Sequence, residues 1–107
     1  MSGNHSRRKG RAGEAAFKRV LIERDYDVVD CTAGTVGCDL VALKDTTAWA
    51  VEVKAAKNLM IETWLGQARV QAVGRRRWML ACRLPGFPRY WLVLKQNEEP
   101  TIWKGNK

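Results

Sequence analysis

The chain has 107 residues, which suffice for one compact domain with a single modest core and are too few for two domains. Lysine and arginine number 19 against 11 acidic residues, and the resulting charge of +8 favours a polyanionic partner, most commonly nucleic acid, over a membrane surface. Three cysteines without a CxxC pair, and a single histidine near the N-terminus, disfavour both a disulfide framework and a zinc site.

The first predicted element is an amphipathic helix over residues 8–25, after a polar segment 1–6 that we expect to be disordered. Apolar residues such as Phe17 and Leu21 recur at helical spacing. Toward the N-terminus, the next position on the same face of the helix is Glu14, three residues before Phe17. An acid there can simply favour the helix dipole. Alternatively, its carboxylate faces inwards as a ligand.

Further along the chain, β-branched and apolar runs separated by turn residues predict strands, and a longer periodic segment predicts a second helix. The strands are expected at 26–31, 39–43, 48–54, 77–84 and 89–96, the helix in the second half of 55–77, and one edge strand within 98–107. This order predicts an α/β domain with one mixed sheet and helices packed on it.

The run GCDLVALKDTTAWAVEVKAA, residues 37–56, carries three charges among small and apolar residues. Strand alternation puts Glu52 and Lys54 on one face of the strand 48–54. If this strand pairs with 39–43 across KDTT, paired residue numbers sum to 91 and Asp39 lies opposite Glu52. Their Cβ atoms would then be about 4.5–5.5 Å apart.

Two adjacent carboxylates repel each other unless a cation lies between them. Asp39, Glu52 and Lys54 can form a purely structural cluster. The functional alternative is a Mg²⁺ site, because Mg²⁺ takes hard oxygen ligands from carboxylates, water and phosphate. Asp39, Glu52 and the Val53 carbonyl would be its ligands. Lys54 would help to activate an attacking water and stabilise charge growing on phosphorus.

The sequence at this point resembles a known family. Asp39 followed by Glu52-Val53-Lys54 is similar to the motif of the PD-(D/E)XK nuclease superfamily. With RKGRAGEAAF at 8–17, YDVVDCTAGTVGCDLVAL at 26–43 and AVEVK at 50–54, residues 7–57 resemble the archaeal-type Holliday junction resolvases, which also occur in phages.

The resemblance implies a restriction-endonuclease-like core, a central mixed sheet flanked by helices, over a single nuclease domain 1–107. It also implies that Glu14 completes the metal site and that Thr35 stands where the family has serine. It implies a homodimer that uses Mg²⁺ or Mn²⁺ to cut branched DNA symmetrically, in DNA recombination and repair. Cys38 stands where the superfamily motif has proline.

Basic residues near these motifs are candidate phosphate contacts, which position DNA without reading its sequence. They are Arg7, Arg8, Lys9 and Arg11, with Lys57 beyond the motif. The first four can equally form a solvated basic arm. Arg75, Arg76 and Arg77 can favour the dipole at the end of the second helix. Gln67 and Gln71 fit exposed helix positions better than ligands.

The function predicted first is therefore a Mg²⁺-dependent endonuclease that resolves four-way junctions by phosphodiester hydrolysis. The alternatives are another nuclease on the same core, such as a flap, nicking or repair enzyme, and a non-catalytic DNA-binding protein. We expect no small-molecule cofactor and no membrane association. The sequence has no signal peptide and no apolar run of 18 residues, so we expect a cytoplasmic protein, or a phage protein acting in the host cytoplasm.

Overall fold

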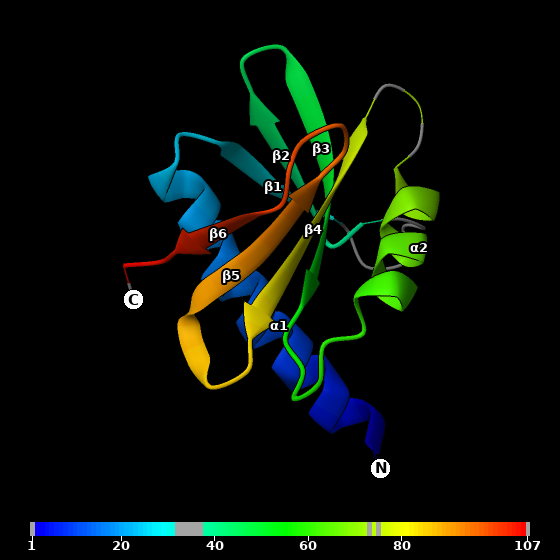
Figure 1. The fold of residues 1–107 in the computed structure, drawn as a ribbon, viewed down its shortest axis with the longest axis vertical. Helices are drawn as coiled ribbons and strands as arrows, with labels where there is room; N and C mark the ends of the chain where they lie inside the picture. Colours follow the sequence, from blue (N-terminus) through cyan, green and yellow to red (C-terminus); the bar gives the residue numbers. More distant parts are fainter. Residues whose placement is uncertain (1, 32–37, 73, 75, 107) are drawn as a thin grey trace.

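The computed structural model describes residues 2–31, 38–72, 74 and 76–106, with side chains from Gly13 onward. Over these residues the chain forms one six-stranded sheet and two helices, which cover opposite faces of the sheet (Figure 1). The predicted α/β architecture is therefore confirmed. The elements are α1 (Ser2–Glu23), β1 (Asp27–Asp30), β2 (Leu40–Lys44), β3 (Thr47–Lys54), α2 (Ile61–Gln71), β4 (Arg77–Leu84), β5 (Phe87–Lys95) and β6 (Thr101–Lys104).

The sheet is mixed, as predicted, and its strands follow chain order from β1 to β6. All neighbouring strands pair antiparallel except β3 and β4, which pair parallel. A parallel pair needs a crossover connection, and the chain from β3 to β4 runs through α2. The predicted edge strand near the C-terminus is β6.

Helix α1 begins at Ser2, earlier than the predicted start at residue 8, and so includes most of the segment expected to be disordered. No proline interrupts this polar stretch, so the helical hydrogen bonds continue through it. The helix ends at Glu23, and Asp25 follows with φ of 67°. That left-handed conformation, which aspartate tolerates, turns the chain into β1.

The larger part of the core lies between α1 and the sheet. The predicted stripe of α1 is buried, with Phe17 and Leu21 fully enclosed. On β3 the odd-numbered residues, including Val51, face this core together with Met79 of β4 and Trp91 of β5. The strand parity predicted for β3 is therefore confirmed, and the even-numbered face must meet the other helix.

A smaller core lies under α2. Trp64 and Ala68 of the helix pack against Leu80 and Cys82 of β4. The sequence predicted a stripe of Ile61, Leu65, Ala68 and Ala72. That prediction is correct only for Ala68 and for the partial packing of Leu65, because the face of α2 that packs on β4 is the one that carries Trp64.

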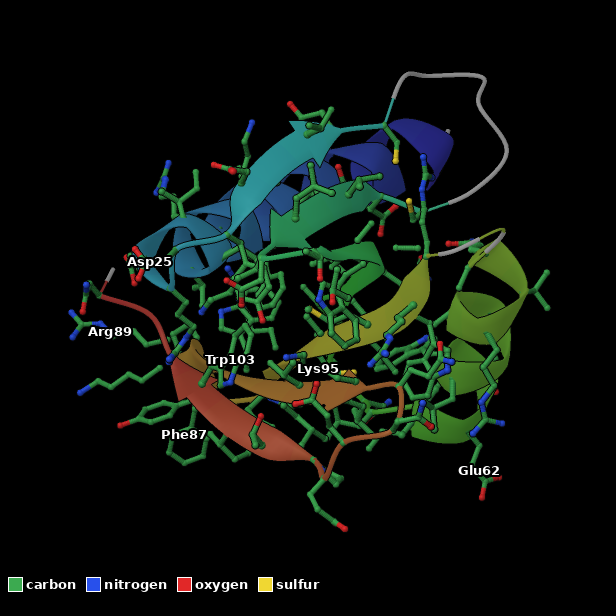
Figure 2. All side chains as sticks on the ribbon, turned by 90° about the horizontal axis from the view of Figure 1, so that it is seen from above. Asp25, Glu62, Phe87, Arg89, Lys95 and Trp103 are labelled. Carbon is green, nitrogen blue, oxygen red and sulfur yellow. The ribbon has the colours of Figure 1, made fainter. Side chains whose placement is uncertain are left out.

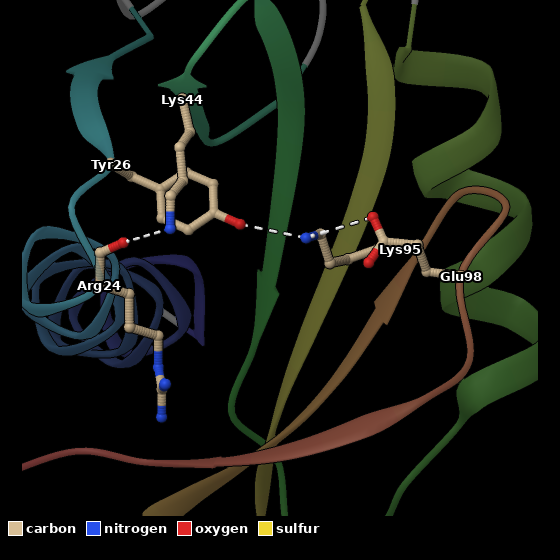
Figure 3. Close-up of polar contacts among 5 residues, drawn as sticks. All are labelled: Arg24, Tyr26, Lys44, Lys95 and Glu98. Atoms are coloured by element: carbon tan, nitrogen blue, oxygen red, sulfur yellow. Dashed lines mark hydrogen bonds and ion pairs between the residues drawn. The ribbon is translucent and has the colours of Figure 1, made fainter.

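A network of lysine and aromatic side chains closes the end of the sheet at the β2–β3 turn (Figure 3). Lys44 Nζ donates to the carbonyl of Arg24 at 2.9 Å, and Lys95 Nζ donates to the Tyr26 hydroxyl at 3.1 Å. Lys95 also pairs with Glu98 at 3.3 Å and lies over the Trp49 ring. This end of the sheet is thus fixed by structural contacts, and it lies at the opposite end of β3 from Glu52.

Seen from above, helices α1 and α2 lie over opposite faces of the sheet (Figure 2). Phe87 and Arg89 lie near strand β6, whereas Glu62 on α2 points away from the sheet.

Neither helix in the described part of the chain is long and apolar enough to span a membrane.

Candidate functional site

The β2–β3 hairpin brings Asp39 beside Glu52. The predicted register is confirmed, since Leu43 pairs with Ala48 and Leu40 pairs with Val51. The turn is tighter than the predicted four residues, because Lys44 and Thr47 already pair and Asp45 takes a φ of 55°. Regular pairing with β3 ends at Leu40, the residue that follows Asp39 in the chain, so Asp39 lies just outside the ladder.

Asp39 is held at the strand end by two contacts with β3. Its backbone N–H donates to the carbonyl of Val51 at 2.9 Å. Its carboxylate Oδ2 accepts the backbone N–H of Val53, also at 2.9 Å. The side chain thereby replaces a ladder hydrogen bond between the strands. Asp39 therefore does not form the regular cross-strand pair predicted with Glu52, but its carboxylate is fixed next to that residue.

Glu52 is a buried carboxylate at the carboxyl end of β3, only 5% exposed. Burial raises its pKa, and the neighbouring Asp39 charge raises it further, whereas the ammonium of Lys54 lowers it. The result is a pKa of about 7. Two crowded carboxylates, one of them titrating near neutrality, form a site that gains from a bound cation.

Lys54 lies next to Glu52 on the α2 face of the sheet, as strand alternation predicted. Its Nζ is 3.3 Å from Glu52 Oε1, and its side chain is 27% exposed. Parallel pairing puts Lys54 beside Cys82 of β4. One cation cannot neutralise two carboxylates, so the cluster of Asp39, Glu52 and Lys54 keeps a net negative charge when both acids are ionised.

The donor chemistry of this cluster fits Mg²⁺, because both acids offer hard oxygen atoms from adjacent strands. Over residues 13–31, 38–72 and 76–106, no group of three or more histidine, cysteine or acidic residues is arranged to hold a metal ion. Asp39 and Glu52 are therefore the carboxylates that the fold brings together. The metal-ligand roles predicted for the Val53 carbonyl and Glu14 remain predictions.

Glu14 lies on α1 where that helix crosses the end of β3. A Cβ atom added to the preceding Gly13 would be 3.2 Å from the Cβ of Ala55, so helix and strand approach closely there. Glu14 is half-buried and already interacts with part of the chain. The core packed under α1 lies on the face of β3 opposite to Glu52, so helix α1 and the Glu52 side chain are on opposite faces of the sheet.

Two free cysteines flank the segment that leads into Asp39. The Sγ atoms of Cys31 and Cys38 are 3.1 Å apart, with Cys38 buried and Cys31 partly exposed. Burial and the contact with Cys38 raise the pKa of Cys31 to about 12. The predicted role of cysteines as small core residues is confirmed for Cys38 and Cys82, which are both buried.

We expect Cys31 to react slowly with iodoacetamide in the folded protein although it is partly exposed. At pH 8 a pKa of about 12 leaves roughly 10⁻⁴ of the thiol ionised, against about 0.1 for an unperturbed thiol, so alkylation should be about 10³-fold slower. Mass spectrometry of the Cys31 peptide, labelled in buffer and in urea, measures the ratio. Equal rates in both conditions would contradict the raised pKa.

The predicted DNA-binding residues are placed only in part. Arg7, Arg8, Lys9 and Arg11 belong to the helical backbone of α1, and their side chains lie outside the described residues. Thr35 also lies outside the described residues. Lys57 is exposed and lines a cleft just beyond Lys54.

The sequence placed Arg75, Arg76 and Arg77 at the end of the second helix. Arg76 and Arg77 do not lie in its last turn, and Arg75 is outside the described residues. Helix α2 ends at Gln71, and β4 begins at Arg77. Arg76 is exposed, and its charge acts on the Cys31 thiol, so it lies at the edge of the site near Asp39. Sequence reasoning missed Arg83, which lines the same cleft as Lys57, because a single arginine in a strand has no distinctive spacing.

Comparison with known proteins supports the fold. No protein-family profile and no curated protein matches the chain. Among solved structures, the chain is similar to Hjc, a Holliday junction resolvase from the archaeal hyperthermophile Archaeoglobus fulgidus. The two are 22% identical, with a TM-score of 0.58 over 90% of this chain and 84% of that one. The predicted resemblance to these resolvases is thus confirmed at the level of the fold.

Proposed function

We propose that this protein is a Mg²⁺-dependent DNA endonuclease that cuts four-way junctions by phosphodiester hydrolysis. The observation that carries the proposal is the pair of carboxylates, Asp39 and Glu52, with the Lys54 ammonium 3.3 Å from Glu52. A protein that only binds DNA gains nothing from two acids facing a polyanion. The similarity of the fold to a junction resolvase and the net charge of +8 support the same function.

Asp39 and Glu52 would hold the metal ion, with the Val53 carbonyl and Glu14 as further ligands; Mn²⁺ is expected to substitute for Mg²⁺. When bound, the ion supplies a Lewis acid that polarises the phosphodiester. The Val53 N–H orients the Asp39 carboxylate toward the site. The Lys54 ammonium would hold the attacking water and stabilise the negative charge that grows on the phosphoryl oxygens.

The protein is expected to act as a homodimer, because a four-way junction presents two equivalent strands and symmetric cleavage needs two active sites. Exposed apolar side chains such as Val70 on α2, 79% exposed, and Met60 before it, 55% exposed, are available for such an interface. Size-exclusion chromatography with light scattering measures the oligomeric state. A strict monomer with and without DNA would count against junction resolution.

The substrate is tested by incubating the protein with a four-way junction, a flap and a linear duplex of the same sequence, each with Mg²⁺ or with EDTA. We expect cleavage in Mg²⁺ alone, fastest on the junction, with 5′-phosphate ends. If the flap is cut best, the alternative of a flap or repair nuclease replaces junction resolution. Binding without cleavage of any substrate would favour the non-catalytic alternative.

Replacing Lys54 with methionine should lower the single-turnover rate constant of cleavage by about 10²–10³-fold and change the affinity for the junction little, because the ammonium acts on charge that develops in the transition state. Single-turnover cleavage of the junction measures the effect. Lys104→Met removes the same charge from an exposed position on β6 and is expected to cut at the wild-type rate. Similar rates for Lys54→Met and wild type would remove Lys54 from the mechanism.

A further inference from the structure

A cleft of roughly 430 Å³ lies next to the carboxylate site, where β3 ends. One wall is formed by Ala55, Ala56 and Lys57, which directly follow Lys54. The other wall is formed by Arg83 and the β4–β5 turn around Gly86. The small side chains on the first wall leave the cleft open, and its volume is large enough for a phosphate with its sugar.

Arg83 is held in a fixed orientation on β4. It pairs across the sheet with Trp91 of β5, and its guanidinium lies 4.9 Å from the centre of the Trp91 ring. The register shifts between Arg83 and Leu84, and such a bulge redirects the side chain at the end of a regular pairing. A guanidinium stacked on a buried aromatic ring loses little freedom when it binds a planar pair of oxygen atoms.

The Nε atom of Arg83 is buried and has no hydrogen-bond partner within the described part of the chain. Because that atom is enclosed, an anion in the cleft would be bound by the terminal nitrogens of the guanidinium, which carry its other N–H donors. Arg83 and Lys57 are the charged residues among those described as lining the cleft, and no carboxylate lines it. The cleft therefore has the positive charge expected of an anion site.

The cleft opens at the same end of β3 as the carboxylates, and Arg83 reaches it from the side of the sheet that faces α1. Ala55 is three residues beyond Glu52, which is about 10 Å along a strand. A DNA strand carries one negative charge per nucleotide, so a strand that passes the end of β3 can place one phosphate at the carboxylates and another in the cleft. An anion bound there would fix the position of the strand along its own direction.

We propose that this cleft binds a backbone phosphate of the strand that is cut, close to the scissile phosphate. Arg83 is the positioning residue, and Lys57 supplies the second charge. This inference rests on the proposed nuclease function. The inference goes beyond the proposed function because the cleft contributes to binding and alignment of the DNA and takes no part in bond cleavage.

The test compares Arg83→Gln and Arg83→Lys with Arg89→Gln, which removes the same charge from an exposed residue outside the cleft. Fluorescence anisotropy gives the dissociation constant of a four-way junction in EDTA between about 50 and 200 mM KCl. Arg83→Gln should weaken binding about tenfold or more and reduce the slope of log K against log salt by about one. Arg83→Lys should keep the wild-type slope. Equal slopes for Arg83→Gln and Arg89→Gln would overturn the proposal.

Because Arg83→Gln also loses its stacking on Trp91, Ala56→Leu tests the cleft by filling it and leaves that stacking unchanged. It should reduce the salt slope by about one as well, and wild-type binding by this variant would refute the cleft as a phosphate site. Wild-type protein that binds the junction with the expected slopes but never cuts it would refute the nuclease function alone. No salt-dependent binding by wild type would refute both.

Discussion

Asp39→Asn is expected to lower the rate of junction cleavage by at least about 10³-fold, which corresponds to a loss of roughly 4 kcal/mol of transition-state stabilisation. The asparagine oxygen can still accept the Val53 N–H that Asp39 accepts at 2.9 Å, so the local backbone should be retained. The change therefore removes the charge that would hold the metal ion and leaves the fold in place. Single-turnover cleavage in Mg²⁺ measures the loss.

The matched control for this variant is Asp45→Asn. Asp45 lies in the turn of the same hairpin, is exposed and has a φ of 55°, a conformation that asparagine also tolerates. It should cut at the wild-type rate. Because Asp39→Asn loses a negative charge facing DNA, it should bind the junction at least as tightly as wild type. Cleavage by Asp39→Asn at the wild-type rate would show that the site has been assigned to the wrong residues.

Glu52→Gln is expected to abolish cleavage and, in EDTA at pH 8, to raise the free energy of unfolding by about 2 kcal/mol. The pKa of Glu52 is about 7 in the folded protein against 4.5 for an unperturbed group, so the folded state binds the proton more tightly. Protonated Glu52 therefore stabilises the fold fully below about pH 4.5, and this stabilisation is lost as the pH rises toward 7. At roughly 1.4 kcal/mol per pH unit, the loss in wild type is on the order of 3 kcal/mol.

Urea unfolding of the two proteins at pH 5 and pH 8 in EDTA measures this difference. The stability advantage of Glu52→Gln should be larger at pH 8 than at pH 5, because glutamine does not ionise. Glu62→Gln is the control, since Glu62 is exposed and points away from the sheet (Figure 2). Mg²⁺ should stabilise wild type at pH 8 and have a smaller effect on Glu52→Gln. Equal stability of the two proteins at both pH values would contradict a raised pKa.

Asp39→Asn and Glu52→Gln together distinguish a catalytic site from a cluster of charges that only stabilises the fold. If Asp39, Glu52 and Lys54 existed to hold the hairpin together, removing one acid would destabilise it. The structure instead has a carboxylate whose pKa rises because it is buried and because a second acid lies beside it, and one lysine does not offset these two effects. Stability given up at such a position is typical of a binding or catalytic role.

The sequence predicted most of the local structure correctly. Alternation along β3 and the turn between β2 and β3 predicted the register from Leu43–Ala48 to Leu40–Val51, because a one-residue slip would move every apolar side chain to the wrong face. The helical period predicted the buried face of α1. The prediction for α2 was weaker, because that helix has apolar residues on several sides and its packing on β4 decides which of them are buried.

The sequence alone determined the fold class, the acids on the β2–β3 hairpin and the face that Glu52 shares with Lys54, since these follow from periods of two and 3.6 residues along the chain. Only the tertiary structure decided how Asp39 is held, through the Val53 N–H, and how strongly burial raises the pKa of Glu52. Only the tertiary structure brought Arg83 of β4 beside Lys57, which follows β3. Hydrogen bonds, the degree of burial and contacts between distant segments depend on how strands and helices pack. A pattern along one strand or helix predicts which face is buried but does not specify the residues that this face contacts.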